Sequence, residues 1–327
     1  MQGQEHVELA KEGAKAVNKL EEIILKIFGP HWTKKQADAD AYADEKKLQT
    51  IRNNPDMEIV YTGREMHARE RSSEALLARA QHRKLLEEVR QEQNIESVIQ
   101  IASEEVEHGE CNDSSVDEDW INRFFSIVRD VSTEDMQVIW GKILAGEIKK
   151  PGSYSLRTLD TIRNMSQNEA KTFESIAPYI FILYNGWFLP NNKEILAKYH
   201  IRYSDIMLLD ECGLVNSDGM LSFSPELSVH TTCSFHNNND LLEIRGKTER
   251  RKATNISVYP LTKAGEELYN LLAIPNIPSN YMIDLAKWIY KENPDITIKV
   301  YKIVGSEGEK IKYKSQPIES FGIENEE

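Results

Sequence analysis

The most regular part of the chain is residues 117–149, which read DEDWINRFFSIVRDVSTEDMQVIWGKILAGEIK. Large apolar residues recur here at steps of three and four, the period of an amphipathic helix. Asp117 or Asp119 can cap a first helix, and Ser132 with Asp135 resembles the capping box of a second one. The stretch therefore predicts two consecutive helices at the centre of the fold.

Two further short helices extend this motif. One starts at Ser153 or Ser155, and the next opens with a second capping-box pattern, Ser166 with Glu169. The large aromatic residues of the motif stand at helical spacing, so we expect them in a core rather than in a cofactor site. These aromatic residues are Trp120, Phe124, Phe125 and Trp140.

The residues before this motif are also helical in pattern. Residues 5–28 carry one apolar stripe that Gly29-Pro30 ends, a second helix is expected over 33–52, and residues 62–108 read as a long helical region. Seven basic and five acidic residues lie between positions 64 and 90, a mixture typical of a solvated face. The alternative is a basic helix that faces a partner, with Arg64, Arg71, Arg79 and Arg83 as its contacts.

A different pattern begins near residue 187. A helix ending in LLDECGLV (208–215), the turn signal Asp218-Gly219 and the run YPLTKAGEEL (259–268) follow one another. This order resembles winged-helix domains over residues 187–272. The helix that would read DNA carries three acids, and residues 187–270 hold nine basic against eleven acidic residues, which argues against DNA. One basic cluster lies here and could meet phosphate or an acidic partner: Arg245, Lys247, Arg250, Arg251 and Lys252.

These patterns predict a mainly α-helical protein. An N-terminal helical region and a small helical bundle precede a winged-helix-like α+β module, and a C-terminal helix and β-hairpin close the chain. The expected domains are 1–60 (N-terminal helices), 61–110 (long helical region), 111–186 (four-helix core motif), 187–274 (winged-helix-like module with the inserted loop 224–255) and 275–327 (helix, hairpin and acidic tail).

Composition narrows the class of protein. The 327 residues include 40 Lys and Arg against 53 Asp and Glu, a net charge of −13 that disfavours extensive nucleic-acid coating. Three cysteines without paired spacing favour a reducing cytoplasm, and no signal peptide or membrane span is expected. The His108–Cys111 and His230–Cys233–His236 spacings do not supply four converging ligands, so we expect no metal and no cofactor.

Four segments carry a family resemblance. They are RQEQNIESVIQIASEE (90–105), the run from VDEDWINRFF to EAKTFE (116–174), LDECGLV (209–215) and LTKAGEELYNLL (261–272). They resemble a bacterial family of unknown function, the one numbered 2806, over about residues 75–300. The resemblance implies no activity, cofactor or catalytic residue. The helical front half is also faintly similar to abortive-infection proteins of phage defence.

No nucleotide-binding, zinc-protease or hydrolase motif occurs in the chain. The leading hypothesis is therefore a non-enzymatic cytosolic bacterial interaction or sensor protein, which oligomerises or binds a protein partner in phage defence. One alternative is a winged-helix DNA-binding transcriptional regulator that uses the basic cluster. The second alternative is an enzyme whose site is assembled in space and is not visible in the sequence.

Overall fold

The structure is a computed structural model, and it describes residues 2–28, 59–61, 66–68, 73–107, 111–183, 186–272, 280–307 and 310–322. The chain divides into two compact units, Met1–Leu156 and Arg157–Glu327. None of the described helices is both long and apolar enough to cross a membrane.

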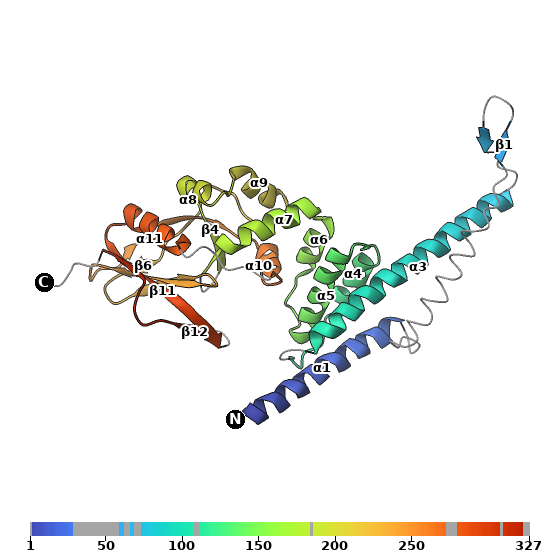
Figure 1. Ribbon diagram of the computed structural model, residues 1–327, viewed down its shortest axis with the longest axis horizontal. Helices are drawn as coiled ribbons and strands as arrows, with labels where there is room; N and C mark the ends of the chain where they lie inside the picture. Colours follow the sequence, from blue (N-terminus) through green and yellow to red (C-terminus); the bar gives the residue numbers. More distant parts are fainter. Residues whose placement is uncertain are drawn as a thin grey trace. The chain divides into compact units, whose positions relative to one another are not determined.

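Unit 1 is built from helices. Its elements are α1 (Gln2–Phe28), the strands β1 (Ile59–Tyr61) and β2 (Met66–Ala68), α3 (Ser73–Val106), α4 (Glu118–Val128) and α5 (Glu134–Lys149). The two short strands pair with each other in antiparallel fashion. The C-terminal half of α3 packs along α5, and α1 packs against both (Figure 1). The expected aromatic core is confirmed, since Trp120, Phe124, Phe125 and Trp140 are all buried.

The helix starts of unit 1 agree with the sequence in one case and differ in another. Asp117 caps α4 as predicted, and its carboxylate accepts a hydrogen bond from the Trp120 amide at 2.9 Å. The predicted cap at Ser132 is wrong, because α5 has Thr133 at its N-cap. The Ser132 hydroxyl instead lies 3.4 Å from the Asn94 side-chain amide of α3.

Unit 2 combines short helices with many strands. Its helices are α6 (Leu156–Asn164, which begins one residue before the unit boundary), α7 (Gln167–Ile176), the 3-10 turn η1 (Ala177–Tyr179), α8 (Lys193–Lys198), α9 (Tyr203–Glu211), α10 (Lys263–Tyr269) and α11 (Tyr281–Glu292). Its strands are β3 (Phe181–Leu183), β4 (Gly186–Pro190), β5 (Ser222–Phe223), β6 (Glu226–Leu227), β7 (Thr232–His236), β8 (Asp240–Gly246), β9 (Lys252–Ala253), β10 (Ile256–Pro260), β11 (Ile296–Glu307), β12 (Lys310–Tyr313) and β13 (Glu319–Phe321).

One nine-stranded antiparallel sheet organises unit 2. The strand order is β12-β11-β8-β7-β3-β4-β10-β5, and β13 pairs with the outer side of β11. β6 and β9 form a separate two-stranded pair. The register sets Val300 opposite Leu242 and Ile298 opposite Ile244, which places four apolar side chains on one face. Helix α11 packs on that face and closes the core with Leu285 and Ile289.

This sheet corrects the expected fold class. The chain is not mainly α-helical with a closing hairpin, because β11 and β12 belong to the nine-stranded sheet rather than to a separate C-terminal hairpin. The segment 224–255, expected as an inserted loop, supplies β7 and β8 to the middle of the same sheet. The winged-helix module is not confirmed. The short strands gave too little local pattern, and the pairings of β7 with β3, β10 with β4 and β11 with β8 join segments far apart in the sequence.

Turn signals in unit 2 had mixed outcomes. The capping box of Ser166 and Glu169 at the start of α7 is confirmed, as is the C-terminal glycine of α9, since Gly213 has φ +72°. The hairpin predicted at Asp218-Gly219 is wrong. Val215 bridges to Leu261, and β5 pairs with β10, so the two runs on either side of the turn pair with the segment 256–261 and not with each other.

Several sequence predictions fall outside the described residues. They are the helix expected over 33–52, the contacts Arg64 and Arg71, and His108. The long helix expected over 62–108 begins at Ser73 as α3, and Met66, expected on that helix, lies on β2.

Candidate functional site

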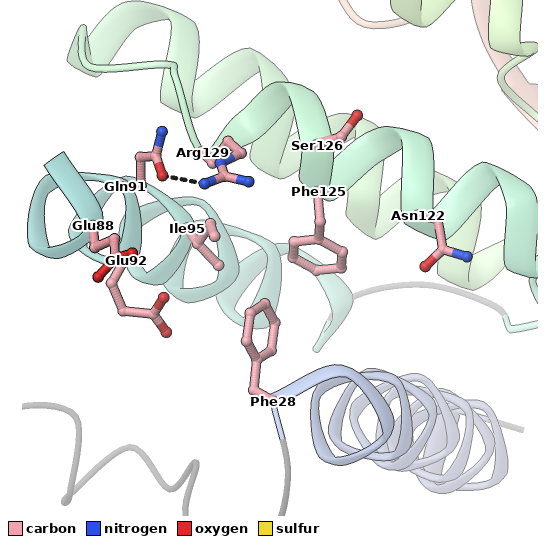
Figure 2. Close-up of a pocket in the computed structure, with 9 residues that line it drawn as sticks. All are labelled: Phe28, Glu88, Gln91, Glu92, Ile95, Asn122, Phe125, Ser126 and Arg129. Atoms are coloured by element: carbon pink, nitrogen blue, oxygen red, sulfur yellow. Dashed lines mark hydrogen bonds between the residues drawn. The ribbon is translucent and has the colours of Figure 1, made fainter. Parts of the chain in front are cut away.

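A groove in unit 1 is the first candidate site. It has a volume of about 400 Å³ and lies where the end of α1 meets α3 and α4 (Figure 2). Nine residues line it: Phe28, Glu88, Gln91, Glu92, Ile95, Asn122, Phe125, Ser126 and Arg129. A cavity of this size lies within the range of sites that bind ligands or anchor side chains of partners.

The floor of the groove is apolar and ordered by packing. The Phe28 ring meets the Phe125 ring edge to face, with centroids 5.3 Å apart and an interplanar angle of 83°. Ile95 of α3 is buried beside them. Because α1, α3 and α4 each contribute one of these side chains, the floor exists only when the three helices are assembled.

The rim of the groove is polar and charged. The Arg129 guanidinium donates a hydrogen bond to the Gln91 side-chain oxygen, as Figure 2 shows, and the Gln91 amide donates to Asp130 at 3.1 Å. Glu88 pairs with Lys84 at 3.7 Å. Arg129 and Gln91 are thus held in place by groups of the rim itself.

Glu92 differs from these neighbours. No cation of the described residues lies within 4.0 Å of its carboxylate. Loss of water around the carboxylate raises the pKa of Glu92, and the positive charge of Arg129 opposes this rise only in part. A cation brought to this rim by a binding partner would therefore find a carboxylate with no close counterion.

The predicted basic cluster of unit 2 is only partly neutralised by neighbouring groups. Lys252 pairs with Asp295, and the Lys247 ammonium lies 5.4 Å from the centre of the Tyr290 ring. Within the described residues, no carboxylate lies within 4.0 Å of Arg245, Arg250 or Arg251. All five side chains are exposed.

Among the described residues, the remaining sequence candidates do not form a second site. Arg83 is exposed on α3, and Arg79 is half-buried and already has an interaction partner. His230 pairs with Glu249 at 2.8 Å, whereas Cys233 and His236 lie on strand β7. The described residues contain no group of three or more His, Cys, Asp or Glu side chains that could hold a metal ion.

Sequence reasoning did not single out the groove. One signal was present, because adjacent phenylalanines on a helix lie about 100° apart and cannot both face one neighbour. Phe124 packs against Trp140 of α5, whereas Phe125 points toward α1. The Phe124-Phe125 pair thus indicated that α4 contacts two elements, but not which element forms the second contact.

Comparison with known proteins places the chain in a family. A family model described as Protein of unknown function (DUF2806) matches residues 78–185 and 187–286, and the chain therefore belongs to this family. The match covers α4 to α10 with most of α3, and includes eight of the nine groove residues. No curated protein and no solved structure matches the chain.

Proposed function

We propose that this DUF2806 protein is a non-enzymatic interaction protein that binds a protein partner in the groove of unit 1. The observation that carries the proposal is an apolar floor, Phe28 with Phe125, beside a rim carboxylate, Glu92, that has no cation of the described residues within 4.0 Å. Buried apolar anchors supply most of the binding free energy at protein interfaces, and charged rims mainly select the partner.

The chemistry of the groove defines the partner. It is a protein segment with one large apolar side chain for the floor and a Lys or Arg placed to reach Glu92. Binding such a segment lowers the pKa of Glu92 and releases a proton when the carboxyl is protonated beforehand. A second copy of this chain could supply the segment as well as another protein, and the two sources give different results in the test below.

The test blocks the groove without disturbing the core. Ser126 is an exposed helical serine at the groove, with its hydroxyl bonded to the Arg123 carbonyl at 2.7 Å. Ser175 on α7 is its match outside the groove, bonded in the same way to the Thr172 carbonyl at 2.8 Å. Tagged wild type, Ser126→Trp and Ser175→Trp are cross-linked in cells, treated with nuclease and analysed by mass spectrometry, and their masses are measured by light scattering.

We expect cross-links from the groove to one partner in wild type and in Ser175→Trp, and their loss in Ser126→Trp. If the partner is a second copy, Ser126→Trp also converts an oligomer into a monomer. A monomeric protein whose cross-links are the same in all three variants contradicts the proposal.

A role in phage defence is part of the same proposal and rests on the helical pattern of the N-terminal half of the chain. It predicts that cells producing wild type give a lower plating efficiency of a sensitive phage than cells producing Ser126→Trp. Equal plating efficiencies at equal protein levels contradict this setting and leave the binding test above unaffected.

A second candidate function is binding of nucleic acid by the basic cluster of unit 2. The observation that favours it is the absence of a carboxylate within 4.0 Å of Arg245, Arg250 and Arg251 among the described residues. Duplex DNA binding that weakens with salt should be lost when Arg250, Arg251 and Lys252 become Glu. The charge-matched control carries Glu at Arg163, Lys171 and Lys193, which are also exposed on unit 2.

A further inference from the structure

The sheet of unit 2 has a second face, opposite α11, that the described helices leave open along β7, β8 and β11. Side chains alternate between the two faces of a strand, so the neighbours of the buried Leu242, Ile244 and Ile298 point to this second face. Six residues of this face are exposed or half-buried: Thr232, Ser234, Glu243, Arg245, Thr297 and Lys299. Leu241 and Tyr301, further along the same face, are buried.

The register arranges these residues in rows across the sheet. Arg245 stands between Thr232 and Thr297, and the next row sets Glu243 between Ser234 and Lys299. Tyr301 follows two residues after Lys299 on the same face of β11. The rows of basic and hydroxyl side chains on β8 and β11 therefore lie next to Tyr301.

Two tyrosines, Tyr301 and Tyr313, lie at the end of these rows. Ile303 is paired with Tyr313 of β12, and the rings of Tyr301 and Tyr313 lie with their centroids 5.1 Å apart. Tyr301 is 8% exposed, whereas Tyr313 is 43% exposed. Tyr301 therefore supports the ring of Tyr313. Tyr313 lies on β12 where β12 pairs with β11 beyond Lys302, the last residue of β11 that pairs with β8.

The charge on this face is opposite to that of the chain as a whole. Arg245 and Lys299 have no carboxylate within 4.0 Å among the described residues, and Glu243 is the one acid of the two rows. In a chain with a net charge of −13, a local excess of cations beside an exposed aromatic ring fits an anionic ligand that can also stack.

We propose that this open face binds single-stranded nucleic acid. Tyr313 stacks on an unpaired base, and Arg245 and Lys299 contact the phosphates. Six residue steps along β11 lead from Thr297 to Ile303, a length of about 20 Å, which accommodates a short single-stranded segment. A duplex does not fit equally well, because its bases are already stacked and cannot reach the ring. This inference shares its ligand class with the second candidate function but uses other residues, apart from Arg245.

The experiment is fluorescence anisotropy with labelled oligothymidylate, oligouridylate and a mixed-sequence duplex, over a range of salt concentrations. The variants are Tyr313→Ala and Lys299→Glu, and the control is Tyr203→Ala, since Tyr203 is an exposed tyrosine on α9 (61%). We expect single-strand binding that weakens about tenfold in Tyr313→Ala, the loss of one stacked base. Lys299→Glu should weaken binding and reduce its salt dependence, and Tyr203→Ala should leave it unchanged.

Two outcomes overturn the inference. One is the absence of single-strand binding at low salt. The other is binding that Tyr313→Ala and Lys299→Glu leave unchanged. Duplex binding that only the Arg250, Arg251 and Lys252 substitutions abolish, without single-strand binding, supports the second candidate function and overturns this inference. Circular dichroism spectra that match wild type show that each variant is folded.

Discussion

At the residue scale, the contact between α3 and α5 depends on Gly141. A Cβ atom at this position would lie 2.4 Å from the Cγ2 atom of Ile101 on α3 and 2.7 Å from its Cβ atom. Such distances are far below van der Waals contact, so any larger residue pushes the two helices apart. The close packing beside the buried Trp140 therefore requires glycine.

We predict that Gly141→Ala destabilises unit 1. In an exposed helix this change would gain about 1 kcal/mol of helix propensity, but overpacking here costs about 1–3 kcal/mol. Urea unfolding should show a net loss of roughly 1 kcal/mol. The control is Gly219→Ala, where the nearest atom to a new Cβ lies 3.9 Å away. A Gly141→Ala protein as stable as wild type contradicts the prediction.

Glu92 gives a prediction for pH. In the folded state the pKa of Glu92 is raised above its ordinary value of 4.5. The protonated carboxyl therefore favours the folded state at acid pH, and this stabilisation is lost as the pH rises through the folded-state pKa. Glu92→Gln should therefore be more stable than wild type at neutral pH and equal to it below about pH 4. Thermal unfolding of both proteins across this range measures the difference. A stability difference between the two proteins that does not change with pH would contradict the raised pKa of Glu92.

At the scale of the element, two N-caps differ in what their side chains do. Ser166 accepts a hydrogen bond from the Glu169 amide at 3.3 Å, and the Glu169 carboxylate accepts one from the Ser166 amide at 2.5 Å. Thr133 occupies the N-cap of α5, but its side chain makes no capping bond. The two caps thus allow a matched comparison.

We predict that Ser166→Ala costs about 1 kcal/mol of the free energy of unfolding of unit 2. Thr133→Ala should cost unit 1 only a few tenths, because no side-chain bond is lost. Denaturant titration followed by tryptophan fluorescence and circular dichroism measures both values. Equal losses of unfolding free energy for the two variants would show that the side-chain bonds of the Ser166 capping box do not stabilise α7.

An element can be predicted from the sequence when the interactions that determine it are local. The caps at Asp117 and Ser166 depend on neighbours three residues away, and both were predictable. Strand β8 follows β7 directly, but its other neighbour is β11, whose first residue, Ile296, faces Gly246. Nothing within a local window identifies this second partner, so the sheet does not follow from the local sequence.

The candidate site follows the same rule. The basic cluster is contiguous in sequence and was visible as a run of charges between Arg245 and Lys252. The groove joins Phe28 to Ile95 and Phe125, residues on three helices, and only the assembled unit brings them together. The tyrosine pair of the open sheet face likewise depends on the pairing of β11 with β12.

At the scale of the whole molecule, the chain contains two units, each with its own core. We predict two unfolding transitions in calorimetry. Gly141→Ala should lower only the first unit's transition, and Phe235→Leu, at a fully buried site in the sheet, only the second. Each shift should be about 2–4 °C per kcal/mol lost. A single transition that both substitutions move would contradict independent unfolding.

The position of β11 has a consequence for synthesis of the protein. β11 is the last long strand to leave the ribosome, yet it lies inside the sheet, with β8 on one side and β12 and β13 on the other. Unit 1 can fold while unit 2 is still being translated. Until Ile296 emerges, β8 presents an unpaired edge that other nascent chains can join. An added chaperone that covers this edge during synthesis should therefore raise the soluble yield.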